Sequence, residues 1–199
     1  MPALESIEQA KRVGPLRAIS GVLNGTSNFV LDQLAAGVPI DRAVKVAQDL
    51  GYAEVDPQFD LDGTDAAQKL ILLTQAAFGE SLPLTAIHLQ GIDQLDTTTF
   101  TDAQEKRRTV RLVAECRRVK NRLEASVAPV SLSADHPLAS VAGVENRLLI
   151  ESEVGDLCIV SGKGAGRWPT TEAVMADLLD LKRESQTRET IEAREECVA

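Results

Sequence analysis

In the first part of the chain, hydrophobic residues recur every three or four positions, which is the spacing of an amphipathic helix. The repeat is clearest between Ile40 and Leu50, where the apolar positions form one face. Pro39 suits a first helical turn, and Gly51 suits a helix end. The pattern predicts helices over 3–12, from about 26 to 37, over 39–50 and over about 64–78, with a buried strand over 17–23.

Beyond residue 80 the apolar runs become shorter, and one of them alternates between apolar and polar positions as a half-buried strand does. The predicted strands are 86–92, 110–116, 123–132, 147–153 and 157–161, and Val154-Gly155-Asp156 predicts a hairpin connection. A last helix is expected to begin at Pro169-Thr170-Thr171. Together these elements predict an α+β domain over 1–181, with a mixed β-sheet and helices packed on one face. Residues 182–199 are rich in charge and predict a helix extension or a frayed tail.

Composition narrows the classes of function. The 199 residues carry a net charge of −9 and only 3% aromatic residues, so a nucleic-acid-binding surface is not expected. No apolar run reaches the ~18 residues of a membrane span, and the N-terminus lacks the apolar core of a signal peptide. With two distant histidines a zinc site is not expected, and we predict no metal site. The cysteines form no C-x-x-C pair and are typical of free thiols in a reducing cytoplasm.

The candidate chemistry is concentrated in residues 54–69, where several acidic residues precede one lysine. Asp65 and Lys69 are four residues apart, so a helix presents both on the same face. Carboxylates bind an ammonium group, and a lysine donates a proton to an oxygen that gains electrons. The segment therefore suits a site that holds a small zwitterion and supplies a proton. The acidic residues that precede this pair are Glu54, Asp56, Asp60 and Asp62.

Each of these signals also has an ordinary structural interpretation. An exposed ion pair at this spacing is common on helices, and acidic residues often form a solvated surface. A calcium loop is disfavoured because the twelve-residue spacing that ends in a glutamate is absent. The glycines of 162–166 fit either a ligand-binding turn or a simple turn. A strand-to-helix turn explains Asn24-Gly25-Thr26, with Thr26 or Ser27 as the cap, and His88 in its apolar run fits a core position.

Four segments taken together resemble the catalytic domain of homoserine dehydrogenases in order and spacing, over about residues 19–181. They are 21–31, 51–57, 60–69 and 162–166. By position, the resemblance implies that Lys69 is the proton donor and that Asp65 is its neighbouring catalytic carboxylate. It implies that the substrate-binding residues are Glu54, Asp60, Tyr52, Gly25 and Thr26. It also places Gly164 beside the bound cofactor.

The resemblance further implies an oxidoreductase that interconverts L-homoserine and L-aspartate 4-semialdehyde with NAD or NADP, and a homodimer built on the sheet. The family's G-x-G-x-x-G turn does not occur in these residues. We therefore expect a catalytic-domain portion that is inactive without a nucleotide-binding domain supplied in trans. The alternatives are a non-catalytic dimerisation or amino-acid-binding remnant, and a remnant that folds but binds nothing.

Overall fold

In the computed structural model of the chain, the described residues are 1–95, 97–163, 171, 174–175, 178–179 and 181–182. The chain divides into two compact units, Met1–Gly164 and Ala165–Ala199. The described residues of the second unit are helical. The rest of the predicted last helix, and the charged tail beyond Lys182, lie outside the described residues.

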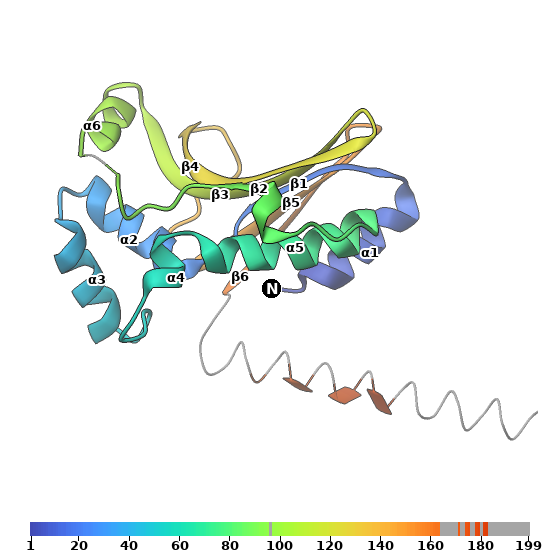
Figure 1. Cartoon of the computed structure of the whole chain (residues 1–199), viewed down its shortest axis with the longest axis horizontal. Helices are drawn as coiled ribbons and strands as arrows, with labels where there is room; N and C mark the ends of the chain where they lie inside the picture. Colours follow the sequence, from blue (N-terminus) through green and yellow to red (C-terminus); the bar gives the residue numbers. More distant parts are fainter. Residues whose placement is uncertain (96, 164–170, 172–173, 176–177, 180, 183–199) are drawn as a thin grey trace, which may run out of the picture. The chain divides into compact units, whose positions relative to one another are not determined.

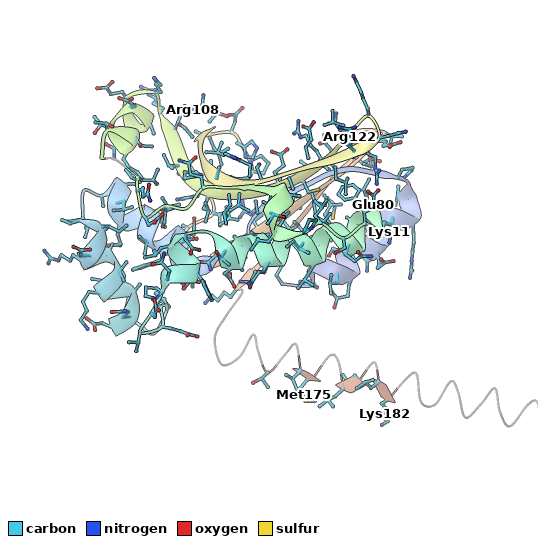
Figure 2. All side chains as sticks on the ribbon, viewed as in Figure 1. Lys11, Glu80, Arg108, Arg122, Met175 and Lys182 are labelled. Carbon is cyan, nitrogen blue, oxygen red and sulfur yellow. The ribbon has the colours of Figure 1, made fainter. Side chains whose placement is uncertain are left out.

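Six strands of the first unit form one mixed sheet, in the order β2-β4-β3-β1-β5-β6. β2 runs parallel to β4, and the other neighbouring strands are antiparallel. Figure 2 shows Arg108 and Arg122 at opposite ends of the long β3–β4 pair. Because β1 lies in the middle of the sheet, the segment after β1 leaves from the sheet's centre. The strands are β1 (Leu16–Val22), β2 (Ile87–Leu89), β3 (Arg108–Val119), β4 (Arg122–Ser133), β5 (Glu145–Ser152) and β6 (Leu157–Lys163).

Helices pack on one face of this sheet, as the sequence predicts, and Figure 1 shows α5 running along the sheet with α1 beside it. The main core lies between these layers, where each fully buried Leu or Ile contributes ~1.5–3 kcal/mol. Ile19 of β1, Leu70 of α5 and Ile150 of β5 are among its buried members. The helices are α1 (Ala3–Val13), α2 (Gly25–Ala35), α3 (Ile40–Asp49), α4 (Gln58–Leu61), α5 (Thr64–Phe78) and α6 (Thr97–Glu105), with a 3-10 turn, η1, at Leu84–Ala86.

The opposite face of the sheet has a smaller apolar cluster under the segment between β4 and β5. Its members are Val22, Val113, Leu132, Leu138, Ala139, Val141 and Leu149. This segment covers only part of the face, since Val130, Leu157 and Ile159 are 38%, 49% and 50% exposed. The sheet therefore has one face that is covered by helices and one that is partly open.

Most predicted helices and strands are confirmed, and the differences concern β2, α4 and α6. The strand expected over 86–92 is only three residues long, because Gly91 turns away to pack against the backbone of Leu61 and Asp62. His88 is exposed, so the expected core position is wrong: β2 is an edge strand, and only Ile87 reaches the interior. The sequence missed α4 and α6. In α6, threonines hide the helical spacing of the buried Phe100 and Ala103.

Candidate active site

A glycine turn brings the start of α5 to the end of β1. Gly63 precedes the helix with φ 85°, a conformation that glycine adopts without strain. The carboxylate of Asp62 accepts a hydrogen bond of 2.8 Å from the N–H of Thr64, which satisfies one of the free donors of the first turn. Figure 1 shows α4 beside this end of α5. The first two turns of α5 therefore lie where the chain leaves the centre of the sheet.

Lys69 is held by two acceptors at this point. Its Nζ donates a hydrogen bond of 2.6 Å to Oδ2 of Asp65 and one of 3.2 Å to the carbonyl oxygen of Leu23. The side chains of Lys69 and Asp65 are 46% and 31% exposed, so a small molecule can reach them from solvent. The helical spacing predicts the Asp65–Lys69 pair, whereas the Leu23 carbonyl enters only through the fold. The second acceptor therefore links Lys69 to a backbone group 46 residues earlier in the chain, directly after β1.

Asn24 links the carboxylates, and sequence reasoning did not assign it to the site. Its Nδ2 donates to Oδ1 of Asp60 at 2.6 Å and to Oδ2 of Asp65 at 2.8 Å, and the residue is 4% exposed. Asn24 is also the N-cap of α2, because its Oδ1 accepts a hydrogen bond from the N–H of Ser27. The predicted cap at Thr26 or Ser27 is therefore wrong. The sequence signal for this cap is an asparagine that stands between a buried strand and a helix.

The carboxyl group of Asp60 is half-buried on α4. Burial raises the pKa of the Asp60 carboxyl above its ordinary value of 3.8, because the carboxylate loses contact with water. The hydrogen bond from Asn24 lowers this pKa, the negative charge of Asp65 raises it, and the positive charge of Lys69 lowers it. The three charged groups therefore act on one another within a single cluster. We name Asn24, Asp60, Asp65 and Lys69 the acid–lysine cluster.

Gly25, Thr26 and Tyr52 form a wall beside this cluster. A Cβ at Gly25 would lie 2.9 Å from the carbonyl oxygen of Val144, so only glycine fits this close approach of two backbones. The hydroxyl of Thr26 donates a hydrogen bond of 2.6 Å to the carbonyl oxygen of Tyr52. The ring of Tyr52 meets that of Phe29 edge to face, with 5.3 Å between centroids. These contacts tie the start of α2 to the loop after α3.

Glu54 and Gly164 are the two remaining predicted residues. Glu54 is exposed on the loop between α3 and α4, and the backbone oxygen of this residue accepts a hydrogen bond from Gln48. Its carboxylate does not join the hydrogen bonds of the acid–lysine cluster. Gly164, which the resemblance places beside the cofactor, lies outside the described residues. The structure therefore brings together Asp60, Asp65 and Lys69 with the wall at Gly25, Thr26 and Tyr52.

The acid–lysine cluster has the groups that an amino-acid substrate needs. A carboxylate accepts up to about four hydrogen bonds, so Asp60 and Asp65 keep capacity for an ammonium group after binding Asn24. The Lys69 ammonium retains the ability to donate to a further oxygen, since it has three N–H groups and two acceptors here. The cluster can therefore hold a small zwitterion and exchange a proton with one of its oxygens.

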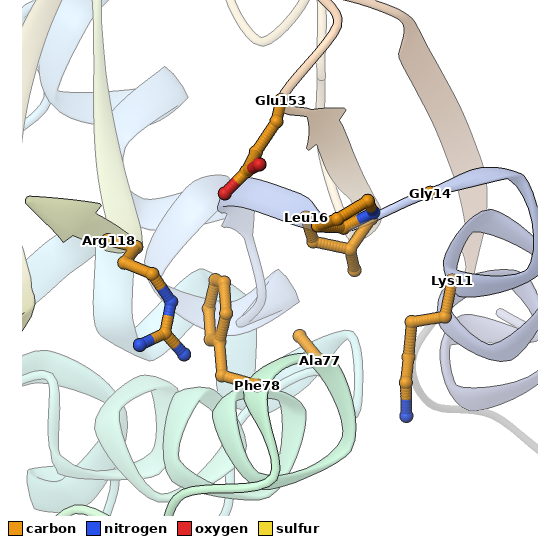
Figure 3. A pocket seen from close by; sticks show the side chains of 8 residues that line it. Lys11, Gly14, Leu16, Ala77, Phe78, Arg118 and Glu153 are labelled. Atoms are coloured by element: carbon orange, nitrogen blue, oxygen red, sulfur yellow. The ribbon is translucent and has the colours of Figure 1, made fainter. Parts of the chain in front are cut away.

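A separate cavity of about 430 Å³ lies at the other end of α5. Figure 3 shows the guanidinium of Arg118 beside the ring of Phe78 at this cavity. Asp65 and Phe78 are thirteen residues apart on α5, which corresponds to about 20 Å at ~1.5 Å per residue. None of the predicted site residues that the structure describes lines this cavity, so we assign the site to the acid–lysine cluster. The lining residues are Lys11, Gly14, Pro15, Leu16, Ala77, Phe78, Arg118 and Glu153.

Within the described part of the chain, no group of three or more His, Cys, Asp or Glu side chains is arranged to hold a metal ion. The helices in that same part are too short or too polar to cross a bilayer.

We expect Asp60→Asn to keep or raise the free energy of unfolding at about pH 7. A raised folded-state pKa gives a stability contribution that is fully present below the unfolded value of 3.8 and is lost as the pH rises through the folded pKa. Ionised Asp60 therefore lowers stability at about pH 7, and an amide removes this loss. Urea denaturation at about pH 3.5 and about pH 7 measures the difference.

Asp49→Asn is the matched control, because Asp49 is an exposed carboxylate that also pairs with a lysine, Lys45, on a helix. We expect no gain of stability from that substitution. A loss of stability in Asp60→Asn that grows from about pH 3.5 to about pH 7 would contradict the raised pKa of Asp60.

Comparison with known proteins identifies the family. The sequence profile of the homoserine dehydrogenase family matches residues 2–179. Homoserine dehydrogenase of Lactococcus lactis is 37% identical over 187 residues, which cover 92% of this chain and 44% of that protein. The NAD(+)-dependent homoserine dehydrogenase of Pseudomonas canavaninivorans is 35% identical over 188 residues, which cover 94% of this chain and 53% of that protein.

A solved structure agrees with the sequence matches. The homoserine dehydrogenase of Thiobacillus denitrificans superposes with a TM-score of 0.88 at 34% identity, over 94% of this chain and 44% of that chain. The chain thus spans about half the length of the proteins it matches. A profile match across nearly the whole chain, together with this shared fold, shows that the chain belongs to the homoserine dehydrogenase family.

Proposed function

We propose that this chain supplies the substrate-binding and acid–base half of an oxidoreductase that interconverts L-homoserine and L-aspartate 4-semialdehyde. The observation that supports this function most strongly is the placement of Lys69, which two acceptors hold beside two carboxylates. A lysine that is fixed in this way can meet a substrate oxygen while the carboxylates meet the substrate ammonium.

Lys69 acts on the oxygen at C4 of the substrate. When the aldehyde is reduced, negative charge develops on that oxygen, and the Lys69 ammonium stabilises the charge and then gives a proton. In the opposite direction, Lys69 takes the proton from the hydroxyl of homoserine. Asp65 fixes the position of the Lys69 ammonium through the bond of 2.6 Å.

The carboxylates and the wall hold the amino-acid end of the substrate. Asp60 binds the substrate ammonium through a charge-assisted hydrogen bond, and Asn24 fixes the orientation of the Asp60 carboxylate at 2.6 Å. In this proposal Gly25 and Thr26 approach the substrate through the backbone of the first turn of α2, and Tyr52, whose carbonyl oxygen binds the Thr26 hydroxyl, lies beside it. Glu54 reaches the substrate from its exposed loop.

We propose that these residues do not hold the dinucleotide by themselves. At the start of the glycine turn, Gly162 packs against the chain's Met1, whose Cα would lie 3.1 Å from a Cβ at position 162. The sequence contains no G-x-G-x-x-G turn that would cradle a pyrophosphate. Family members act with a nicotinamide cofactor, as the name of the Pseudomonas canavaninivorans relative states for NAD(+). In this protein, we propose, NAD or NADP is held mainly by a nucleotide-binding domain outside these residues.

Calorimetric titration of L-homoserine into the chain tests this function. We expect saturable binding to the wild-type chain and at least about tenfold weaker binding to Asp60→Ala, which removes a charged partner of the ammonium. Asp49→Ala, on an exposed pair of α3, should bind as the wild type does. The absence of homoserine binding to the folded wild-type chain would favour a remnant that binds nothing.

We further propose that two copies of the chain associate through the open face of the sheet. Figure 1 shows this face on the side of the sheet away from α5. A hollow of about 380 Å³ there is lined partly by Val113, Val130, Leu132 and Leu149. Two ion pairs of this region form within the chain, between Glu115 and Arg117 and between Arg17 and Glu151. A partly apolar face with internal ion pairs suits an identical face of a second copy better than a charged partner.

Light scattering checks this assembly. We expect a mass twice that of the chain, 21.4 kDa, at micromolar concentration. Ile159→Lys places a charge on the open face and should give monomers, because burying an unpaired charge is unfavourable. Val13→Lys is the control, since Val13 is 73% exposed at the end of α1, away from this face, and should leave the mass doubled. A wild-type chain of single mass would exclude the dimer.

A further inference from the structure

Asn146 is a buried residue whose side-chain amide binds the backbone next to the acid–lysine cluster. It lies on β5, opposite Gly162 of β6, and is 5% exposed. Its Nδ2 donates a hydrogen bond of 3.3 Å to the carbonyl oxygen of Leu23. Because that oxygen is an acceptor, the NH₂ group must face it, and the orientation of the amide is therefore fixed. The other end of the amide, Oδ1, is buried without a hydrogen-bond partner among the described residues.

The stability of the core does not explain this asparagine. A buried carbonyl oxygen without a partner is unfavourable, and the single bond from Nδ2 compensates only in part. The neighbours of Asn146 along the same face of β5 are the apolar Leu148 and Ile150 of the main core. A leucine at 146 would continue this apolar row without leaving an unpaired oxygen.

The partner of Asn146 connects it to the proposed catalytic lysine. The carbonyl oxygen of Leu23 accepts hydrogen bonds from both Asn146 and Lys69, at 3.3 Å and 3.2 Å. A carbonyl oxygen has two lone pairs, so it can accept both bonds at once. The same peptide group continues into Asn24, whose side chain binds Asp60 and Asp65. Because the peptide is planar, a rotation of the Leu23 carbonyl also moves the backbone of Asn24.

We infer that Asn146 is a positioning residue, which fixes the Leu23 carbonyl and thereby the ammonium of Lys69. Its role in catalysis rests on the proposed function of Lys69, whereas its effect on the position of Lys69 does not. Asn146 does not touch the substrate, because its Oδ1 is buried. Its contribution is to hold one acceptor of the lysine in place before a substrate arrives.

The 199-residue chain itself allows a test that needs no activity. The rate at which the Lys69 ammonium protons exchange with water is measured by nitrogen-15 NMR in the wild type, Asn146→Leu and Asn146→Ala. We expect exchange to be about tenfold faster in both variants, because the Leu23 carbonyl is then free to turn away from Lys69. Thr74→Val is the control: Thr74 is buried on the same helix as Lys69, and valine keeps its shape. Exchange in this variant should match the wild type.

Several outcomes would overturn the inference. These are equal exchange rates in the wild type and both Asn146 variants, or a Lys69 ammonium that is unprotected in the wild type. Failure of both Asn146 variants to fold, judged by urea denaturation, would assign Asn146 to the core instead. We expect the leucine variant to keep its free energy of unfolding, since it removes the unpaired oxygen.

A kinetic experiment separates this inference from the proposed function. In an active enzyme that contains these residues, Asn146→Ala should lower kcat about tenfold and change KM by less than about threefold, because the proton donor is displaced while the ammonium-binding carboxylates remain. If faster exchange is found but L-homoserine does not bind the wild-type chain, the proposed function fails and the positioning role stands. If homoserine binds but kcat and exchange are unchanged by the variants, the positioning role fails alone.

Discussion

Lys69→Ala should lower turnover of homoserine by ~10²–10⁴-fold in an active enzyme that contains these residues, which is the usual contribution of a positioned proton donor. The same substitution should change the melting temperature by no more than a few degrees. The Lys69–Asp65 pair is 46% and 31% exposed, and pairs of this kind contribute about 0–1 kcal/mol to stability. A large loss of rate with a small loss of stability is the signature of a catalytic group.

Lys45→Ala is the matched control for this experiment. Lys45 and Asp49 have the same spacing on α3 and the same distance of 2.6 Å from Nζ to a carboxylate oxygen, but their side chains are 67% and 61% exposed. We expect this variant to keep its turnover. Near-normal turnover in Lys69→Ala would show that Lys69, like Lys45, only forms a surface ion pair. The assignment of Lys69 as the proton donor would then be wrong.

We expect the 199-residue chain alone to turn over homoserine negligibly with either NAD or NADP. Transfer of hydride requires the two reacting carbons about 3–3.5 Å apart in a fixed orientation. In the proposed function the acid–lysine cluster holds one reactant, and the sequence has no G-x-G-x-x-G turn to cradle the pyrophosphate of the other. Adding a nucleotide-binding domain of a homoserine dehydrogenase in trans should raise the rate.

The measurement is absorbance of the reduced nicotinamide at high homoserine concentration. The Lys69→Ala chain mixed with the same added domain serves as the control, because we expect it to keep the fold and to lack the proposed proton donor. Robust turnover by the purified chain without the added domain would contradict this prediction. It would show that these residues bind the dinucleotide themselves.

Local rules allowed the sequence to predict the Asp65–Lys69 pair. A helical spacing of four residues and a glycine before the helix determine that geometry without reference to the rest of the fold. The mixed sheet with helices on one face also follows from the pattern, because apolar residues repeat with helical spacing first and in short strand-like runs later.

The parts that sequence reasoning missed are long-range contacts of backbone and amide groups. Asn24 meets Asp60 and Asp65 across 36 and 41 residues, and Asn146 meets Leu23 across 123 residues. An asparagine carries no charge and has no fixed spacing to its partners, so pattern alone cannot assign these contacts. α4 was missed for a related reason. It is only four residues long, and its start at Gln58 follows a proline within an acidic loop.

Chemical-shift mapping of L-homoserine on the isotope-labelled chain distinguishes the two candidate positions on α5. The acid–lysine cluster and the cavity at Phe78 lie about 20 Å apart along this helix, so their backbone amides report separately. We predict that homoserine shifts the amide signals of Asn24, Thr26, Asp60 and Asp65 and leaves those of Phe78 and Arg118 unchanged. Shifts confined to Phe78 and Arg118, or no shifts at saturating homoserine, would contradict the assignment of the substrate site to the acid–lysine cluster.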